Sequence, residues 1–232
     1  MTLTPSASST SPLALTASLE RVIRASWPKG IDNHGPSGNA YNFDVKGAPF
    51  GYFRSQYHVG GIRLLRDILA FLYANGWAVL SGVQASRRYT DKDVIILRKM
   101  DAPPRNVEWL ALAPMENDRL RVIYDPEGGQ KAKAAPGDYD YMGMVVAAIK
   151  NILVEMGYFQ KGQWEDDSFE FDLQGNPWRA SGEECVKMNI LLMKLLETME
   201  SHGWRLYTNL VQRTGSDEDR ILDTLYFTRY RP

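Results

Sequence analysis

Tyr41-Asn-Phe-Asp-Val-Lys-Gly-Ala-Pro-Phe50 is repeated in outline by Phe169-Glu-Phe-Asp-Leu-Gln-Gly-Asn-Pro-Trp178, which lies 128 positions further along the chain. Phe, Asp, Gly and Pro are identical at corresponding positions, and both stretches begin and end with an aromatic residue. A recurrence of residue type and spacing of this kind is typical of an internal repeat. The two stretches therefore predict a duplicated fold.

A long stretch of helical periodicity follows each motif and ends in Gly-Trp, at Gly76-Trp77 in the first copy and at Gly203-Trp204 in the second. Apolar residues recur there at steps of three and four, so each stretch predicts a helix with one apolar stripe. The glycine closes the last turn, because it readily adopts the left-handed conformation. The stripes are Val59, Ile62, Leu65, Ile68, Leu69 and Leu72 in the first copy, and Val186, Leu192, Leu195, Leu196 and Met199 in the second.

Two strand-like runs follow each Gly-Trp, and they predict a hairpin in each copy. They span 78–83 and 93–99 in the first copy, and 205–210 and 223–229 in the second. The first copy alone continues into a further predicted hairpin over 107–124. We expect this extra hairpin to be an exposed edge that pairs across an interface.

These elements predict an α+β fold of two helix-strand-helix-hairpin units, with antiparallel sheet, helices on one face of it and a pseudo-two-fold relation between the units. Each unit offers too little apolar surface to fold alone, so the two repeats should pack as one domain. We expect a disordered tail over 1–12, a first repeat over 13–124, a linker over 125–140 and a second, shorter repeat over 141–232.

Composition narrows the class of protein and its compartment. The 232 residues include 27 basic and 28 acidic side chains, and a formal net charge of −1 argues against a nucleic-acid partner. No apolar run is long enough for a membrane span, so we expect a soluble chain. The single cysteine, Cys185, and the lack of a secretory leader predict a cytoplasmic protein.

No motif of a known catalytic or metal centre occurs in the sequence. The three histidines have no metal-ligand spacing, and the chain contains no Cys-x-x-Cys, phosphate-binding loop or Gly-x-Ser-x-Gly. Cys185 lies where a buried helical residue is expected, so we assign it no nucleophilic role. We therefore predict no catalytic residue, no metal and no cofactor.

Six residues are candidates for contact with a ligand or partner. Phe50 and Trp178 follow the rigid Gly-x-Pro turns, where an aromatic ring either fills the core, which the turn chemistry favours, or anchors a partner. His58 precedes a predicted helix beside Gly60-Gly61, where backbone amides could bind an anion. Arg87, Arg88 and Tyr89 occupy the predicted tip of the first hairpin.

The leading functional hypothesis is a non-catalytic intracellular protein that binds a protein partner or another copy of itself through the duplicated surface. The first alternative is a carrier of a small or lipid-like molecule, with its pocket between the repeats. The second alternative is an enzyme of unrecognised type, which would draw on His58 with Asp44 or Asp91.

Overall fold

The computed structural model describes residues 2–3, 15–47, 49–50, 58–83, 94–102, 105–124, 136–165, 168–213 and 221–230. Its elements confirm the α+β class. In chain order they are β1 (Thr2–Leu3), α1 (Thr16–Ser26), β2 (Ile31–Ser37), β3 (Ala40–Val45), α2 (His58–Ala74), β4 (Trp77–Val83), β5 (Val94–Lys99), β6 (Val107–Met115), β7 (Arg119–Tyr124), α3 (Pro136–Glu155), β8 (Phe159–Glu165), β9 (Ser168–Leu173), the short 3-10 helix η3 (Pro177–Arg179), α4 (Glu183–Ser201), β10 (Arg205–Arg213) and β11 (Ile221–Tyr230).

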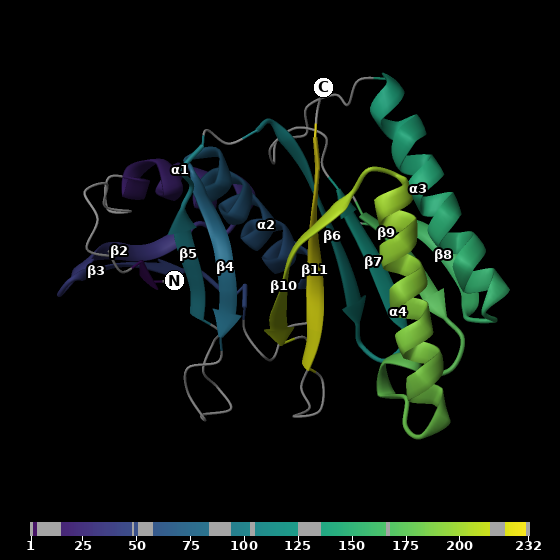
Figure 1. Cartoon of the computed structure of the whole chain (residues 1–232). Coiled ribbons are helices and arrows are strands. Elements are labelled where there is room, and N and C mark those ends of the chain that lie inside the picture. The colour runs from purple at the N-terminus through teal and green to yellow at the C-terminus, as the bar shows by residue number, and fades with distance from the viewer. Residues whose placement is uncertain are drawn as a thin grey trace.

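An antiparallel six-stranded sheet forms the centre of the molecule (Figure 1), with the strand order β10-β11-β6-β7-β9-β8. Helices α3 and α4 pack against one face of this sheet. Their buried residues, among them Val145, Leu191 and Leu195, join Leu110 and Phe227 of the strands in one apolar core. Burial of this apolar stripe is what holds the two helices on the sheet.

The elements before β6 form two smaller sheets. The pair β4-β5 is one, and β1-β3-β2 is the other. Helices α1 and α2 share a second core with them, in which Leu19 and Ile23 of α1 meet Leu64 and Ile68 of α2 around Trp77. We refer to α1 through β5 as the first unit and to α3 through β11 as the second unit.

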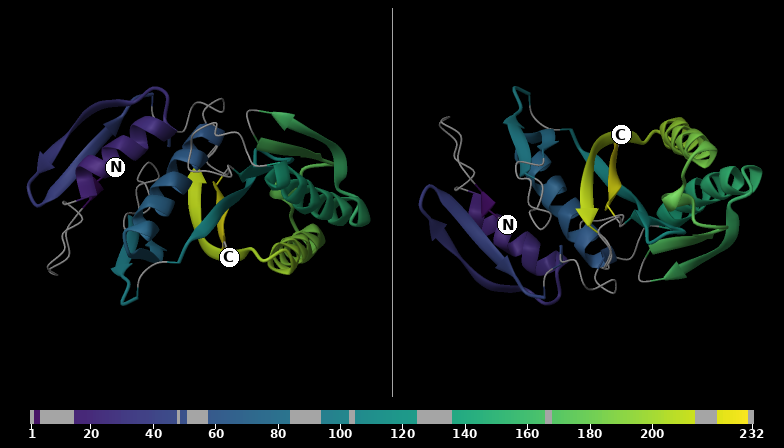
Figure 2. Two further views of the ribbon diagram at one scale, coloured as in Figure 1. Left: turned by 90° about the horizontal axis from the view of Figure 1, so that it is seen from above. Right: turned by 90° about the horizontal axis from the view of Figure 1, so that it is seen from below.

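Helix α2 also packs against the six-stranded sheet. Ile62 and Leu69 contact the face of the six-stranded sheet opposite α3 and α4, where Ala111, Ala113 and Ile123 lie. Figure 2 shows α2 between α1 and that sheet. The central sheet therefore carries helices on both faces, and the prediction of helices on one face only was wrong. Helix α2 has two buried apolar faces, whereas one apolar stripe in a sequence predicts only one layer that the helix packs against.

The same element order, helix-strand-strand-helix-strand-strand, occurs in both units. The strand pairs even share their irregularities. One register shift lies between Val79 and Ser81 in the first unit and between Leu206 and Thr208 in the second. Since bulges of this kind are specific to a local backbone path, their coincidence indicates closely similar hairpins.

The two Gly-Trp dipeptides also occupy matching surroundings. Gly76 and Gly203 have φ of 82° and 79°, which a side chain would strain, and each ends its helix. A cation lies over each tryptophan that follows: the Lys99 amine is 5.2 Å from the Trp77 ring centre, and the Arg229 guanidinium is 5.2 Å from that of Trp204.

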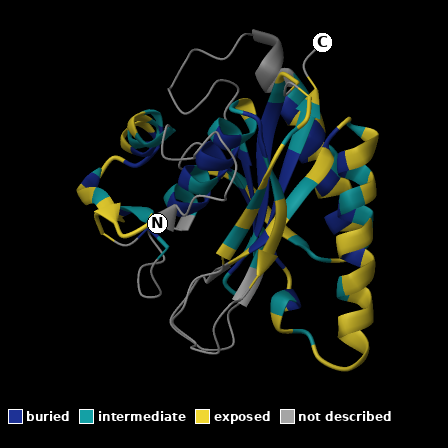
Figure 3. Ribbon diagram, turned by 60° about the vertical axis from the view of Figure 1, so that its left-hand side comes forward, coloured by how far each residue is buried: buried dark blue, intermediate teal, exposed yellow. Residues whose placement is uncertain are grey.

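The extra hairpin β6-β7 is central rather than an exposed edge, so the prediction of a free edge at 107–124 was wrong. Strand β6 pairs with β11, and β7 pairs with β9. Leu110 and Leu120 are fully buried, and Figure 3 shows buried residues gathered in these strands. The hairpin joins the two strand pairs of the second unit into one sheet, because its residues are apolar on both faces.

Two boundaries differ from those predicted. Helix α3 begins at Pro136, inside the range 125–140 that we expected to be a linker. Thr2 and Leu3, in the range 1–12 expected to be disordered, pair with β3 as β1. Proline suits the first turn of a helix, where its missing N–H leaves no bond unmade.

None of the described helices is long and apolar enough to cross a membrane.

Candidate functional site

The two aromatic residues proposed as anchors lie in different cores. Phe50 packs against the core of the first unit, and Trp178 packs against the core of the second. The indole N–H of Trp178 also donates a hydrogen bond of 2.7 Å to the backbone carbonyl of Arg119. The structure does not bring the two rings together, and both rings make the core contacts that the turn chemistry favours.

The side chains of the other four candidates lie outside the part of the chain that the structure describes. His58 is the first residue of α2, but its side chain is not among those described. Arg87, Arg88 and Tyr89 lie outside the described residues, as does Asp91. Asp44 is exposed on β3.

An uncovered apolar surface runs along the outer side of α4. Val186, Ile190 and Met193 follow one another at steps of four and three, and Leu192 lies beside them. All four side chains are exposed, and Met193 keeps 61% of its surface in contact with solvent. The opposite stripe of the same helix is buried. Apolar residues at helical spacing that face solvent are typical of a contact surface.

A second uncovered apolar surface lies on the β4-β5 pair. Leu80 of β4 is 59% exposed, and Val94 and Ile96 of β5 are also exposed. Val94 and Ile96 are two residues apart on one strand, so their side chains point to the same face of the pair. We call these residues the β4-β5 outer face, and the four residues of α4 the α4 outer face.

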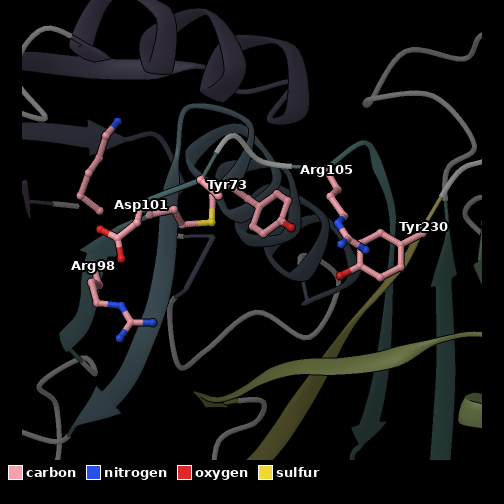
Figure 4. Close-up of a pocket in the computed structure, with 8 residues that line it drawn as sticks. Tyr73, Arg98, Asp101, Arg105 and Tyr230 are labelled. Atoms are coloured by element: carbon pink, nitrogen blue, oxygen red, sulfur yellow. The ribbon is translucent and has the colours of Figure 1, made fainter.

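A pocket of about 340 Å³ lies where the two units meet (Figure 4). Tyr73 at the end of α2 and the residues that follow β5 form one part of it, and Tyr230 at the end of β11 forms another. In Figure 4, Tyr73 lies between Asp101 and Arg105. The lining consists of Tyr73, Arg98, Lys99, Met100, Asp101, Ala102, Arg105 and Tyr230.

Positive charge dominates this junction pocket. Arg98, Lys99 and Arg105 line it against one carboxylate, that of Asp101. The Arg105 guanidinium lies 4.9 Å from the centre of the Tyr230 ring, and the Lys99 amine donates a hydrogen bond of 3.0 Å to the Asn75 carbonyl. The arrangement offers cations and phenol groups to an anion.

The sequence did not indicate this pocket. Its lining comes from separate stretches of the chain, and nothing in the sequence joins Arg98 and Lys99 to Arg105 or Tyr230. Tyr230 lies more than one hundred residues away in sequence, and only the pairing of β11 with β6 brings it near Arg105. Local patterns carry no information about such a pairing.

Buried charges elsewhere in the sheet are held in internal bonds. Arg121 donates hydrogen bonds to Glu170 at 2.6 Å and to the Ser168 hydroxyl at 2.9 Å. Burial raises the pKa of the Glu170 carboxyl above its usual value, although the Arg121 charge acts in the opposite direction. With their bonding groups engaged in the sheet, these side chains have a structural role.

Metal and thiol chemistry receive no support from the described part of the chain. No group of three or more His, Cys, Asp and Glu there is placed to hold a metal ion. Cys185 is exposed near the start of α4, and its thiol donates to the Ala180 carbonyl at 3.1 Å. The expectation that Cys185 is buried was wrong, because the first turns of α4 extend away from the core.

A domain-family model matches residues 9–98 and 108–228, which together make up most of the chain. The chain therefore belongs to this domain family. The match falls in two segments, and the interval between them holds Asp101 and Arg105 of the junction pocket. A search among curated proteins found no match.

Proposed function

We propose that this protein is a non-catalytic assembly protein of the cytoplasm, which associates with further copies of itself through the α4 outer face and the β4-β5 outer face. One observation carries the proposal: each of these exposed faces corresponds, in the other unit, to a face that is buried inside the molecule. The proposal interprets the two units as repeats of one ancestral unit.

The correspondence follows from the two cores. Leu64, Ile68 and Leu72 of α2 are buried in the first core, and Leu191, Leu195 and Met199 of α4, each 127 positions later, are buried in the second. By the same spacing, Val59 and Leu65 of α2 correspond to Val186 and Leu192 of α4. Val59 and Leu65 pack against the six-stranded sheet, whereas Val186 and Leu192 face solvent.

The partner face follows in the same way. Strand β5 corresponds to β11 at a spacing of 130 residues, so Ile96 occupies the position that corresponds to Tyr226. Tyr226 is fully buried in the core between α2 and the sheet, whereas Ile96 is exposed. The α4 outer face therefore corresponds to the face of α2 that packs on the central sheet. The β4-β5 outer face corresponds to the part of that sheet which α2 covers.

The residues on the two exposed faces suit an apolar contact. Inside the molecule the corresponding two residues are polar, since Arg66 on α2 lies close enough to Tyr226 for its charge to act on the pKa of the phenol. Met193 corresponds to Arg66 and Ile96 to Tyr226, so the same position between two copies would pair two apolar side chains. Removing such side chains from water is the main source of association energy.

The geometry of the association follows from the location of the faces. One belongs to the second unit and the other to the first, so each copy would present α4 to the β4-β5 pair of the next copy. Such a heterologous contact produces a ring or an open chain.

The test is size-exclusion chromatography with light scattering over a wide range of concentrations. The mass of the natural chain should rise with concentration, whereas Met193→Lys and Ile96→Lys should each remain at the mass of one chain. A mixture of the two variants should form a dimer and no larger species, because one intact face of each kind remains.

Met144→Lys is the matched control, since Met144 on α3 is 57% exposed and lies outside both faces. This control should associate like the natural chain. A natural chain that stays monomeric throughout, or a Met144→Lys variant as defective as Met193→Lys, would refute the proposal. Circular dichroism verifies that every variant is folded.

A second candidate function is a small-molecule carrier with its pocket between the units. The observation that favours it is the cavity lined by Tyr73 and Tyr230 at their junction. A ligand that binds the folded chain must raise its melting temperature, so a thermal-shift panel tests this function. A panel of polar and apolar ligands without any shift would exclude it.

A further inference from the structure

The junction pocket has the dimensions of a small-ligand site. Its volume of about 340 Å³ lies at the lower end of the range for ligand pockets in proteins. Segments from both units line it, which is a common location for such sites. The pocket is held in place from one side by the backbone, since the N–H of Met100 donates to the Gly76 carbonyl at 2.8 Å.

Its charge selects for anions. In the described part of the chain, neither Arg98 nor Arg105 is paired with a carboxylate, so both guanidinium groups can donate to a ligand. Lys99 adds a third positive charge, which its bond to the Asn75 carbonyl holds near the pocket. Guanidinium donors match the oxygen geometry of phosphate and carboxylate groups.

Its rings select for a planar partner. Tyr73 and Tyr230 both line the pocket, and Tyr230 is partly exposed. The Arg105 guanidinium already lies over the Tyr230 ring, which orients its planar fork before any ligand arrives. An aromatic group in the ligand can pack against these phenol rings and against the Met100 side chain.

We propose that the junction pocket binds a small aromatic anion, a single planar ring that carries one phosphate or carboxylate group. Arg105 binds the anionic group, and Tyr73 and Tyr230 contact the ring. Arg98 lies on the other side of Tyr73 (Figure 4) and adds positive charge to the pocket without touching that group. This inference rests on the carrier function, the second candidate above, and does not depend on self-association.

Titration calorimetry with phenyl phosphate tests the inference. The protein carries Met193→Lys in every titration, so that association of copies cannot alter the signal. Phenyl phosphate should bind in a saturable manner. Inorganic phosphate, which lacks the ring, and phenol, which lacks the charge, should each bind at least roughly tenfold more weakly. Benzoate serves as the carboxylate probe and should compete with phenyl phosphate.

Arg105→Gln should raise the dissociation constant of phenyl phosphate roughly tenfold, since it removes a charged donor. Arg98→Gln should raise it by less, since it removes only a charge elsewhere in the pocket. Arg24→Gln is the matched control, because Arg24 is an exposed arginine on α1 and should leave binding unchanged. Added salt should weaken binding by screening the charges.

Three results would overturn the inference: no saturable binding of phenyl phosphate, binding of phenol as tight as that of phenyl phosphate, or an Arg105→Gln variant that binds phenyl phosphate as tightly as the chain with Arg105. Inorganic phosphate that binds as tightly as phenyl phosphate would overturn the role of the rings. Failure of these titrations leaves the association of the natural chain to be judged separately by its mass, so the two proposals fail independently.

Discussion

The hydroxyl of Tyr207 on β10 accepts a hydrogen bond of 2.8 Å from the backbone N–H of Val79 on β4. This bond joins the edge strand of the six-stranded sheet to the small sheet of the first unit. The Tyr207 ring also lies 4.8 Å from that of Trp109 and 5.8 Å from that of Tyr73, both edge to face. One tyrosine thus ties together both units and the central hairpin.

Tyr207→Phe should lower the free energy of unfolding by about 1 to 2 kcal/mol, because the ring stacking remains while the Val79 N–H loses its acceptor. Urea denaturation measures the change. Tyr230→Phe is the control, since its partly exposed side chain should leave stability within about 0.5 kcal/mol of the natural value. Equal losses in both variants would contradict a special role for the Tyr207 hydroxyl.

Glycine positions on two helices should respond in opposite directions. A Cβ atom at Gly61 of α2 would lie 2.3 Å from the backbone carbonyl oxygen of Pro49, so Gly61→Ala should destabilise the fold by about 1 to 3 kcal/mol. At Gly143 of α3 no atom of the described residues, apart from the helix's own neighbouring backbone, lies within 4 Å of the added group, and Gly143→Ala should stabilise by about 0.5 to 1 kcal/mol. Thermal melts of both variants decide the matter, and a stabilising Gly61→Ala would show that the Pro49 turn moves freely.

Loss of the Glu170 charge should be costly. Glu170→Gln leaves the buried Arg121 guanidinium with only the half-exposed carboxylate of Glu165, and we expect a loss of about 3 kcal/mol in urea denaturation. The control is Glu184→Gln, which removes the exposed pair with Lys187 and should cost less than about 1 kcal/mol. Comparable losses would mean that Arg121 finds other acceptors or water.

Tyr226 should make stability fall at high pH. Burial raises the pKa of its phenol far above the usual value of 10, so above pH 10 the hydroxyl ionises in the unfolded chain but not in the folded one. The unfolded state then binds fewer protons, and each further pH unit costs about 1.4 kcal/mol of stability. Tyr226→Phe should remove this loss, as unfolding free energies at pH 9 and pH 11 would reveal.

At neutral pH the same substitution should be favourable. The Tyr226 hydroxyl is buried without a hydrogen-bond partner among the described residues, and such a group costs about 1 to 3 kcal/mol. We expect Tyr226→Phe to stabilise the protein by roughly 1 kcal/mol at pH 7. Destabilisation at pH 7 would indicate that a bonded water or another group satisfies the hydroxyl.

The helices and the hairpins β4-β5, β6-β7 and β10-β11 could be predicted from the sequence. The pairs β2-β3 and β8-β9 were missed, since only one strand was expected at that place in each unit. Helix α2 ends at Ala74, just before the predicted Gly76-Trp77, and the extra hairpin lies where the turn residues indicated it. These features depend on side chains within one or two turns of each other, because the period of the apolar residues determines helix or strand locally. The junction pocket was not predicted, since none of its lining residues is among the candidate residues of the sequence.

The tertiary structure alone decided where those elements lie. An alternating or continuous apolar strand does not reveal its neighbours, so the sequence could not place β6 and β7 inside the second unit's sheet. It could not show that α2 has a second buried face, or that Tyr230 meets Arg105 at the junction of the units. Such contacts join residues far apart in the chain, and only the packing of whole layers against each other selects them.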